Sequence, residues 1–131
     1  MNNKLLGTRY EEKVAQILYD HGYWVTLLTA SRTGQPADII AIKGTEVALI
    51  DAKFCARDRF ELRRVEPNQI RAMSLLEKRS EHTALATFVL GFSTGNYIVS
   101  WERISELISQ GVKSINLADC EELITLEEWA K

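Results

Sequence analysis

The stretch that decides the fold is Asp38-Ile39-Ile40-Ala41-Ile42, then Lys43-Gly44-Thr45, then Glu46-Val47-Ala48-Leu49-Ile50-Asp51-Ala52-Lys53-Phe54. Its two long runs are nearly all apolar, as in strands that are covered on both faces of a sheet. The short segment between them predicts a turn that pairs the two strands side by side. Polar residues nevertheless enter both runs, and such residues rarely lie in buried strands without a partner.

The flanking segments complete an α/β (α+β) domain. Apolar residues at helical spacing predict a first helix that Gly22 stops, and Pro67 suits the first position of a second helix. In chain order we expect a helix over 4–22, strands over 23–28, 38–42 and 46–54, a helix after 67, strands over 85–92 and 97–101 around a turn at 93–96, a helix containing Ile104, and a short acidic helix. The order αβββαββαα predicts one central mixed sheet flanked by helices.

Length and composition limit the class of protein. The chain has 131 residues, 46% of them hydrophobic and 26% charged. These values predict one folded domain over residues 1–131 and exclude a disordered, collagenous or repeat protein. No apolar run reaches the ~20 residues of a membrane span, and residues 1–6 lack the pattern of an export signal, so we expect a cytoplasmic protein. Cys55 and Cys120 are expected to be free thiols, with no disulfide framework or zinc site.

Charge is unevenly distributed along the chain. The net charge is −2, but residues 53–79 carry 8 basic and 4 acidic side chains, whereas residues 100–131 carry 3 and 7. The basic block could follow a DNA backbone, because Lys and Arg supply most of the affinity for phosphates. A solvated arginine-rich face explains the same pattern equally well. The arginines we consider as DNA ligands in this block are Arg57, Arg59, Arg63, Arg64 and Arg71.

Three polar residues of the decisive stretch can form one site. Asp51 and Lys53 leave the same face of their strand, roughly 6.6 Å apart along it, and pairing through the turn brings Asp38 beside them. Two carboxylates of this kind suit Mg²⁺, which keeps several waters and bridges to phosphates. A neighbouring lysine can orient water and stabilise charge on a phosphate under attack. The alternative is a structural ion pair between Asp51 and Lys53.

Two further residues are placed where the same site could use them. On the first helix, Glu11 lies within roughly 70° of the centre of the apolar stripe, while Glu12 points to water. An inward carboxylate needs a cation or a donor, although Glu11 could also be a satisfied residue at the edge of the core. Gln69 follows Glu66 by three positions at a helix start, so it could instead cap that helix.

Other motifs carry no chemistry. Gly91-Phe92-Ser93-Thr94-Gly95 matches the GxSxG pattern of hydrolases, but a strand follows it, and both histidines, His21 and His82, precede it. A hairpin turn explains these residues. Neither of the glycine-rich loops that hold nucleotide phosphates occurs, so we expect no nucleotide cofactor.

Together these residues resemble the PD-(D/E)XK nuclease superfamily and, within it, the Holliday-junction resolvases. The segment Gly7–Val14 looks like the first-helix motif of archaeal resolvases, and 36–41 and 49–53 look like their metal-binding strands. Residues 60–73 and 111–115 are more similar to bacterial RecU resolvases. The resemblance extends over roughly residues 7–115.

The resemblance implies a role for each site residue. Asp38, Asp51 and Glu11 would bind Mg²⁺, with Mn²⁺ as a substitute, Lys53 would activate the nucleophile, and Gln69 would complete the site. It also implies 5′-phosphate products and a homodimer with one active site for each strand cut. Asp51 stands where the nearest relatives have glutamate. The RecU stalk is absent, and residues 29–35 form a short loop in which Ser31 or Arg32 could contact a phosphate or form a plain polar connection.

Our leading hypothesis is a Mg²⁺-dependent endonuclease that resolves four-way DNA junctions as a homodimer, of a compact type that suits a phage or prophage. One alternative is a nuclease of the same fold that cuts flaps or a restriction-type duplex site. Another is a catalytically inactive DNA-binding module. The full set of Glu11, Asp38, Asp51, Lys53 and Gln69 favours an enzyme.

Overall fold

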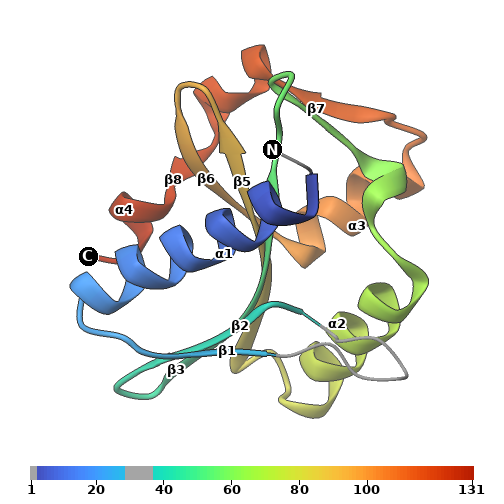
Figure 1. The fold of residues 1–131 in the computed structure, drawn as a ribbon. Coiled ribbons are helices and arrows are strands. Elements are labelled where there is room, and N and C mark those ends of the chain that lie inside the picture. The colour runs from blue at the N-terminus through green and yellow to red at the C-terminus, as the bar shows by residue number, and fades with distance from the viewer. Residues whose placement is uncertain (1–2, 29–36) are drawn as a thin grey trace.

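The computed structural model describes residues 3–28 and 37–131 (Figure 1). Its helices and strands are α1 (Asn3–Asp20), β1 (Trp24–Leu27), β2 (Ile39–Lys43), β3 (Glu46–Phe54), β4 (Arg59–Glu61), α2 (Pro67–Arg79), β5 (Ala84–Phe92), β6 (Gly95–Ser100), α3 (Trp101–Ser109), β7 (Ser114–Asn116), β8 (Ile124–Thr125) and α4 (Leu126–Trp129). Two 3₁₀ turns, at Leu62–Arg64 and Leu117–Glu122, complete the order. The predicted α/β fold class is confirmed.

A six-stranded sheet in the order β1-β2-β3-β5-β6-β8 forms the centre of the molecule. Strands β3 and β5 run parallel, and the other neighbours are antiparallel. The turn at Gly44, where φ is +62°, joins β2 to β3, and their register sets Ile39 opposite Ile50. This register brings the residue before β2 next to the end of β3, where the predicted site residues lie.

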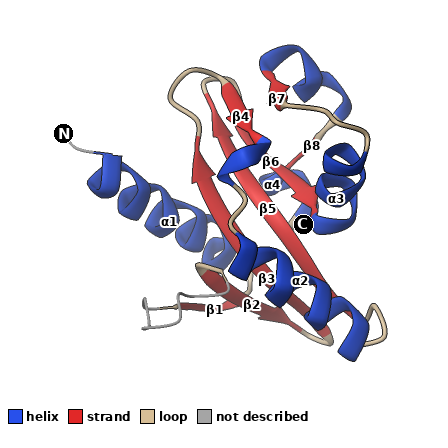
Figure 2. Ribbon diagram, turned by 90° about the vertical axis from the view of Figure 1, so that its right-hand side faces the viewer, coloured by secondary structure: helices blue, strands red, loops and turns tan. Residues whose placement is uncertain are grey.

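Helices cover both faces of the sheet, which gives two cores (Figure 2). On one face α1 packs through side chains such as Val14 and Leu18 against β2 and β3, and α4 adds Leu126 to the same core beside β6. On the other face α2 and α3 contribute Met73 and Ile104 to a core around β5. The site therefore lies where helices from opposite faces meet the same strand ends. Of the described helices, none has the length and apolarity needed to cross a membrane.

The structure corrects several details of the sequence prediction. The strands β4 and β7 form a separate two-stranded sheet, and neither these nor β8 was expected, because two or three residues give too little pattern to detect. The strand predicted over 97–101 ends at Ser100, whose side chain accepts a hydrogen bond from Arg103 N and so starts α3 at Trp101. The loop prediction for Ser31 and Arg32 lies outside the described residues.

Candidate active site

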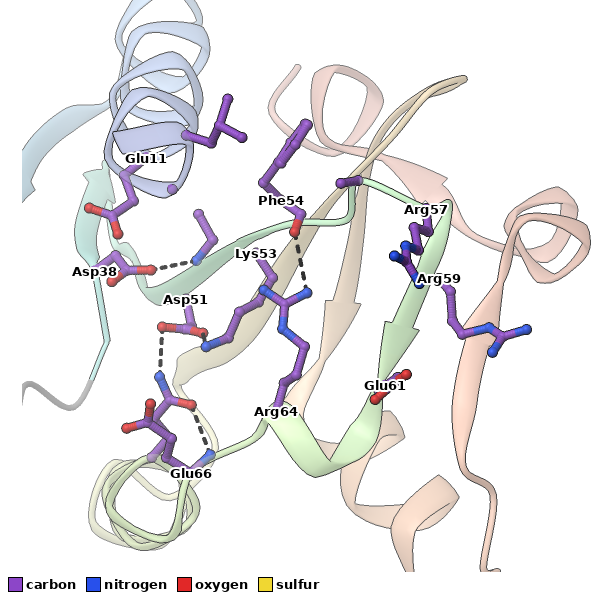
Figure 3. Close-up of a pocket in the computed structure, with 15 residues that line it drawn as sticks. Glu11, Asp38, Asp51, Lys53, Phe54, Arg57, Arg59, Glu61, Arg64 and Glu66 are labelled. Atoms are coloured by element: carbon purple, nitrogen blue, oxygen red, sulfur yellow. Dashed lines mark hydrogen bonds and ion pairs between the residues drawn. The ribbon is translucent and has the colours of Figure 1, made fainter. Parts of the chain in front are cut away.

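The register of β2 and β3 brings Asp38 to the end of β3 (Figure 3). Asp38 N donates to Ile50 O at 3.0 Å, and Asp38 Oδ2 accepts a hydrogen bond from Ala52 N at 2.8 Å. The carboxylate is therefore held by backbone on a strand that also carries Asp51. The predicted convergence of the two aspartates and Lys53 is found.

Asp51 is the most buried member of the site, with 1% of its side chain exposed. Gln69 Nε2 donates to Asp51 Oδ1 at 2.8 Å, and Lys53 Nζ lies 3.1 Å from Oδ2. The lysine forms an ion pair with this buried oxygen, which accepts no well-aligned hydrogen bond from the described residues. A divalent cation would give this oxygen a further partner.

Gln69 makes contacts that agree with both of the interpretations that the sequence left open. Its Oε1 accepts a hydrogen bond from Glu66 N at 3.1 Å, which caps α2 after Glu66. Its amide nitrogen bonds to Asp51 at the same time. An amide can do this because its oxygen accepts while its nitrogen donates. The cap thus fixes the orientation of the group that holds Asp51.

Glu11 enters the site from α1, on the opposite face of the sheet from α2 (Figure 3). Its side chain is half-buried, whereas that of Glu12 is exposed, which confirms the predicted orientation of this helix. Burial and the neighbouring Asp38 carboxyl raise the pKa of Glu11 to about 7. Burial and Asp38 likewise raise the pKa of Asp51 to about 8, against the opposing effect of Lys53. These carboxyls repel one another in the charged state.

The residues present fit a hard divalent cation. Within 3–28 and 37–131 no three His, Cys, Asp or Glu side chains form a ready-made metal cage. Mg²⁺ does not require one, since it binds through one or two carboxylates and completes its octahedron with water and phosphate. A cation would contact the buried Oδ2 of Asp51 and relieve the repulsion between the neighbouring carboxyls.

A cleft of about 1220 Å³ opens over these residues, and only some of the predicted arginines line it. Arg57, Arg59 and Arg64 do, and Arg64 is held by a 3.2 Å hydrogen bond to Phe54 O. Arg63 pairs with Glu61 and is 84% exposed, facing a neighbouring groove. Arg71 is exposed on α2 and is not among the lining residues. The predicted DNA ligands Ser31 and Arg32 lie outside the described residues.

The cleft also contains residues that the sequence did not indicate. Phe54 is an exposed aromatic next to Lys53, Glu61 lies on the same side of the cleft as Arg57 and Arg59, and Glu66 lies at the start of α2 on the side of Asp51 (Figure 3). The count of charges over residues 53–79 includes these acids, but it cannot show that they face the cleft, because it takes no account of side-chain direction. The alternation of side chains along β3 predicts which face of the strand Phe54 leaves, but it does not predict that this side chain is exposed.

Comparisons with known proteins agree with this geometry. A family model described as the archaeal Holliday junction resolvase (Hjc) matches residues 2–119. Among solved structures, the chain is similar to Archaeoglobus fulgidus Hjc, a Holliday junction resolvase from an archaeal hyperthermophile, with a TM-score of 0.72 and 15% identity over 95% of this chain and 100% of that one. At this identity the likeness shows the fold. No curated protein matches the chain closely enough in sequence to be counted as a relative.

Proposed function

The chain belongs to the archaeal Holliday junction resolvase family, a family of nucleases that act on DNA, and from this we propose that it resolves four-way junctions with divalent metal held by Asp38 and Asp51. The observation that carries this assignment is the convergence of Asp38 and Asp51, whose buried Oδ2 is ion-paired with Lys53 Nζ at 3.1 Å and accepts no well-aligned hydrogen bond from the described part of the chain. The cytoplasmic location expected from the sequence stays a prediction, consistent with a DNA substrate. A phage or prophage origin also stays a prediction.

We assign the metal to Asp38 and Asp51, with Glu11 as a third carboxyl that binds it directly or through water. When bound, Mg²⁺ neutralises charge on the phosphate and makes a coordinated water more acidic. The two aspartates are held for this task by Ala52 N and by Gln69 Nε2. The resemblance to resolvases implies Mg²⁺, with Mn²⁺ as a substitute, and carboxylate oxygens are ligands that suit both ions.

We assign Lys53 to the reacting phosphate. Its side chain is largely buried but ends beside Asp51 at the cleft floor. There the ammonium can donate to the attacking water or to a non-bridging phosphate oxygen, whose negative charge grows in the transition state. The attacking water gives up a proton to solvent as it adds to phosphorus, the bond to the 3′ oxygen breaks, and that oxygen takes up a proton from solvent, so the strand ends carry a 5′-phosphate and a 3′-hydroxyl.

We further propose a homodimer, which places one site on each of two strands. The register of β1, β2 and β3 aligns Trp24, Ile42 and Val47 in a row across the sheet, with Trp24 59% exposed. Val25 packs toward the α1 core, so this row lies on the opposite face. Trp24 and Val47 are the exposed apolar side chains of this row, and exposed apolar side chains gathered on one face favour it as an association surface. Sedimentation velocity should show a dimer that W24E dissociates, and a monomeric wild type would overturn this part of the proposal.

The test is cleavage of a labelled four-way junction beside a linear duplex of the same sequence, in Mg²⁺ and in EDTA. We expect paired symmetric nicks in the junction only, lost in EDTA and in Lys53→Ala. Asp38→Asn and Asp51→Asn should abolish cleavage but leave binding equal or tighter, because removing negative charge reduces repulsion of phosphate. Glu12→Gln is the matched control for Glu11→Gln, since Glu12 is exposed beside it.

Each contrary outcome points to a different error. Cleavage of the linear duplex would replace the junction by a restriction-type substrate. Binding without cleavage would favour an inactive DNA-binding module. If the aspartate variants cut normally but bind weakly, the assignment of the metal to these residues is wrong.

A further inference from the structure

The turn between β3 and β4 contains a residue other than glycine with a left-handed backbone conformation. It begins at Cys55 and closes with a hydrogen bond from Asp58 N to Cys55 O at 3.1 Å. Asp58 itself has a φ of +53°, in the left-handed region. Aspartate tolerates this region better than most residues, but the conformation still needs support from surrounding contacts.

That support comes from the hairpin between β5 and β6. Asp58 Oδ1 accepts a hydrogen bond from Ser93 N, and Asp58 Oδ2 accepts one from Ser93 Oγ, both at 2.6 Å. These two bonds hold the pKa of Asp58 below its usual range, so its charged form accepts them at neutral pH. Ser93 is the serine of the rejected GxSxG pattern, so this contact gives the residue a partner that its motif did not suggest.

Asp58 lies between two arginines that line the cleft. Arg57 and Arg59 sit on the wall across from the carboxylates (Figure 3). Arg59 Nε is held by Asn116 Oδ1 at 3.2 Å, whereas no carboxylate in the described part of the chain pairs with Arg57. An acid between them weakens the attraction for phosphate, so its presence there calls for another role.

We propose that Asp58, clamped by Ser93, is a positioning residue that presents Arg57 and Arg59 to the DNA backbone. This inference rests on the proposed function, since it takes the cleft to be the DNA-binding site. The clamp fixes the turn in advance, so the two arginines lose less conformational freedom when they bind phosphate. Asp58 acts through these arginines and touches neither the metal nor the scissile bond.

The test compares two variants of equal charge. Asp58→Gly and Asp58→Asn both remove one negative charge and both accept a positive φ, but only asparagine can keep both contacts with Ser93. Junction and duplex binding are measured in EDTA over a series of salt concentrations, so cleavage does not enter. Single-turnover cleavage at saturating protein is measured separately in Mg²⁺. Ser93→Ala keeps the charge of Asp58 and removes one of the two hydrogen bonds, so it should bind DNA more weakly than the wild type.

We expect Asp58→Gly to bind DNA about tenfold more weakly than Asp58→Asn at 0.1 M salt. The logarithm of the affinity changes by about 0.9 for each phosphate contact and each tenfold change in salt, so one lost contact costs about tenfold at 0.1 M relative to 1 M. The salt dependence should become less steep by about one contact, while the saturated cleavage rate stays unchanged. Equal affinities and salt slopes for the two variants would overturn the clamp while leaving the proposed function intact. Failure of the wild type to cut junctions that it binds would overturn the proposed function, and the binding series would still decide the clamp.

Discussion

Replacing Gln69 by glutamate tests the contact that joins α2 to the candidate site. The introduced side chain keeps an oxygen to accept from Glu66 N, so the cap of α2 survives, but the donor to Asp51 becomes an acceptor. At 2.8 Å from Asp51 Oδ1, in a position only 5% exposed, a second carboxylate cannot be solvated. A hydrogen bond to a charged group contributes about 1.5–3 kcal/mol, and a like-charge contact adds to its loss.

We therefore expect Gln69→Glu to lower the free energy of unfolding by about 2–4 kcal/mol at pH 8.5. At pH 5.5 the loss should be smaller, because the pKa of Asp51 is about 8 and the two carboxyls can then share a proton in a hydrogen bond. Urea unfolding at both pH values, without metal, measures the difference. The Mg²⁺ concentration for half-maximal cleavage should also rise about 10–100-fold, as for other residues that orient metal ligands.

Gln69→Ala is the control that separates the two functions of this side chain. Alanine removes both the cap and the donor but adds no charge, so its loss of stability should depend less on pH than that of Gln69→Glu. If Gln69→Glu is as stable as the wild type at pH 8.5, or if both variants lose the same amount at both pH values, Asp51 does not depend on Gln69 as argued.

Three other predictions follow from the geometry. Because the pKa of Asp51 is raised in the folded state, its contribution to stability is present at low pH and lost as the pH rises through about 8. The free energy of unfolding of the wild type should therefore fall between pH 5 and 9, and Asp51→Asn should make this fall smaller by more than about 1.4 kcal/mol, measured by urea unfolding without metal. A Cβ on Gly91 would lie 2.6 Å from the Tyr10 ring, so Gly91→Ala should destabilise the protein by about 1–3 kcal/mol in thermal unfolding; an unchanged melting temperature would show that the helix yields freely. Arg64→Ala should weaken DNA binding and flatten its salt dependence while Arg63→Ala changes both little, and equal effects would mean that the DNA does not follow the cleft.

The strands and the main carboxylates of the site could be predicted because their signals are local. Alternation along β3 puts Asp51 and Lys53 on one side, and helical periodicity turns Glu11 inward and Glu12 outward. The turn before Glu46 is short enough that only one pairing of β2 and β3 is practical, and this pairing brings Asp38 to the site. Each of these inferences uses residues that are close in sequence or joined by a tight turn.

The contacts between distant segments were decided by the tertiary structure. Whether Gln69 reaches Asp51 depends on how α2 docks on the sheet, and which arginines face the cleft depends on the pairing of β4 with β7. The bond between Asp58 and Ser93 likewise needs the turn and the hairpin to meet. The sequence by itself determined which residues could form a nuclease site, because side-chain direction follows from backbone period. Only the packing of helices and strands decided their partners, because distances between remote segments follow from the sum of all core contacts.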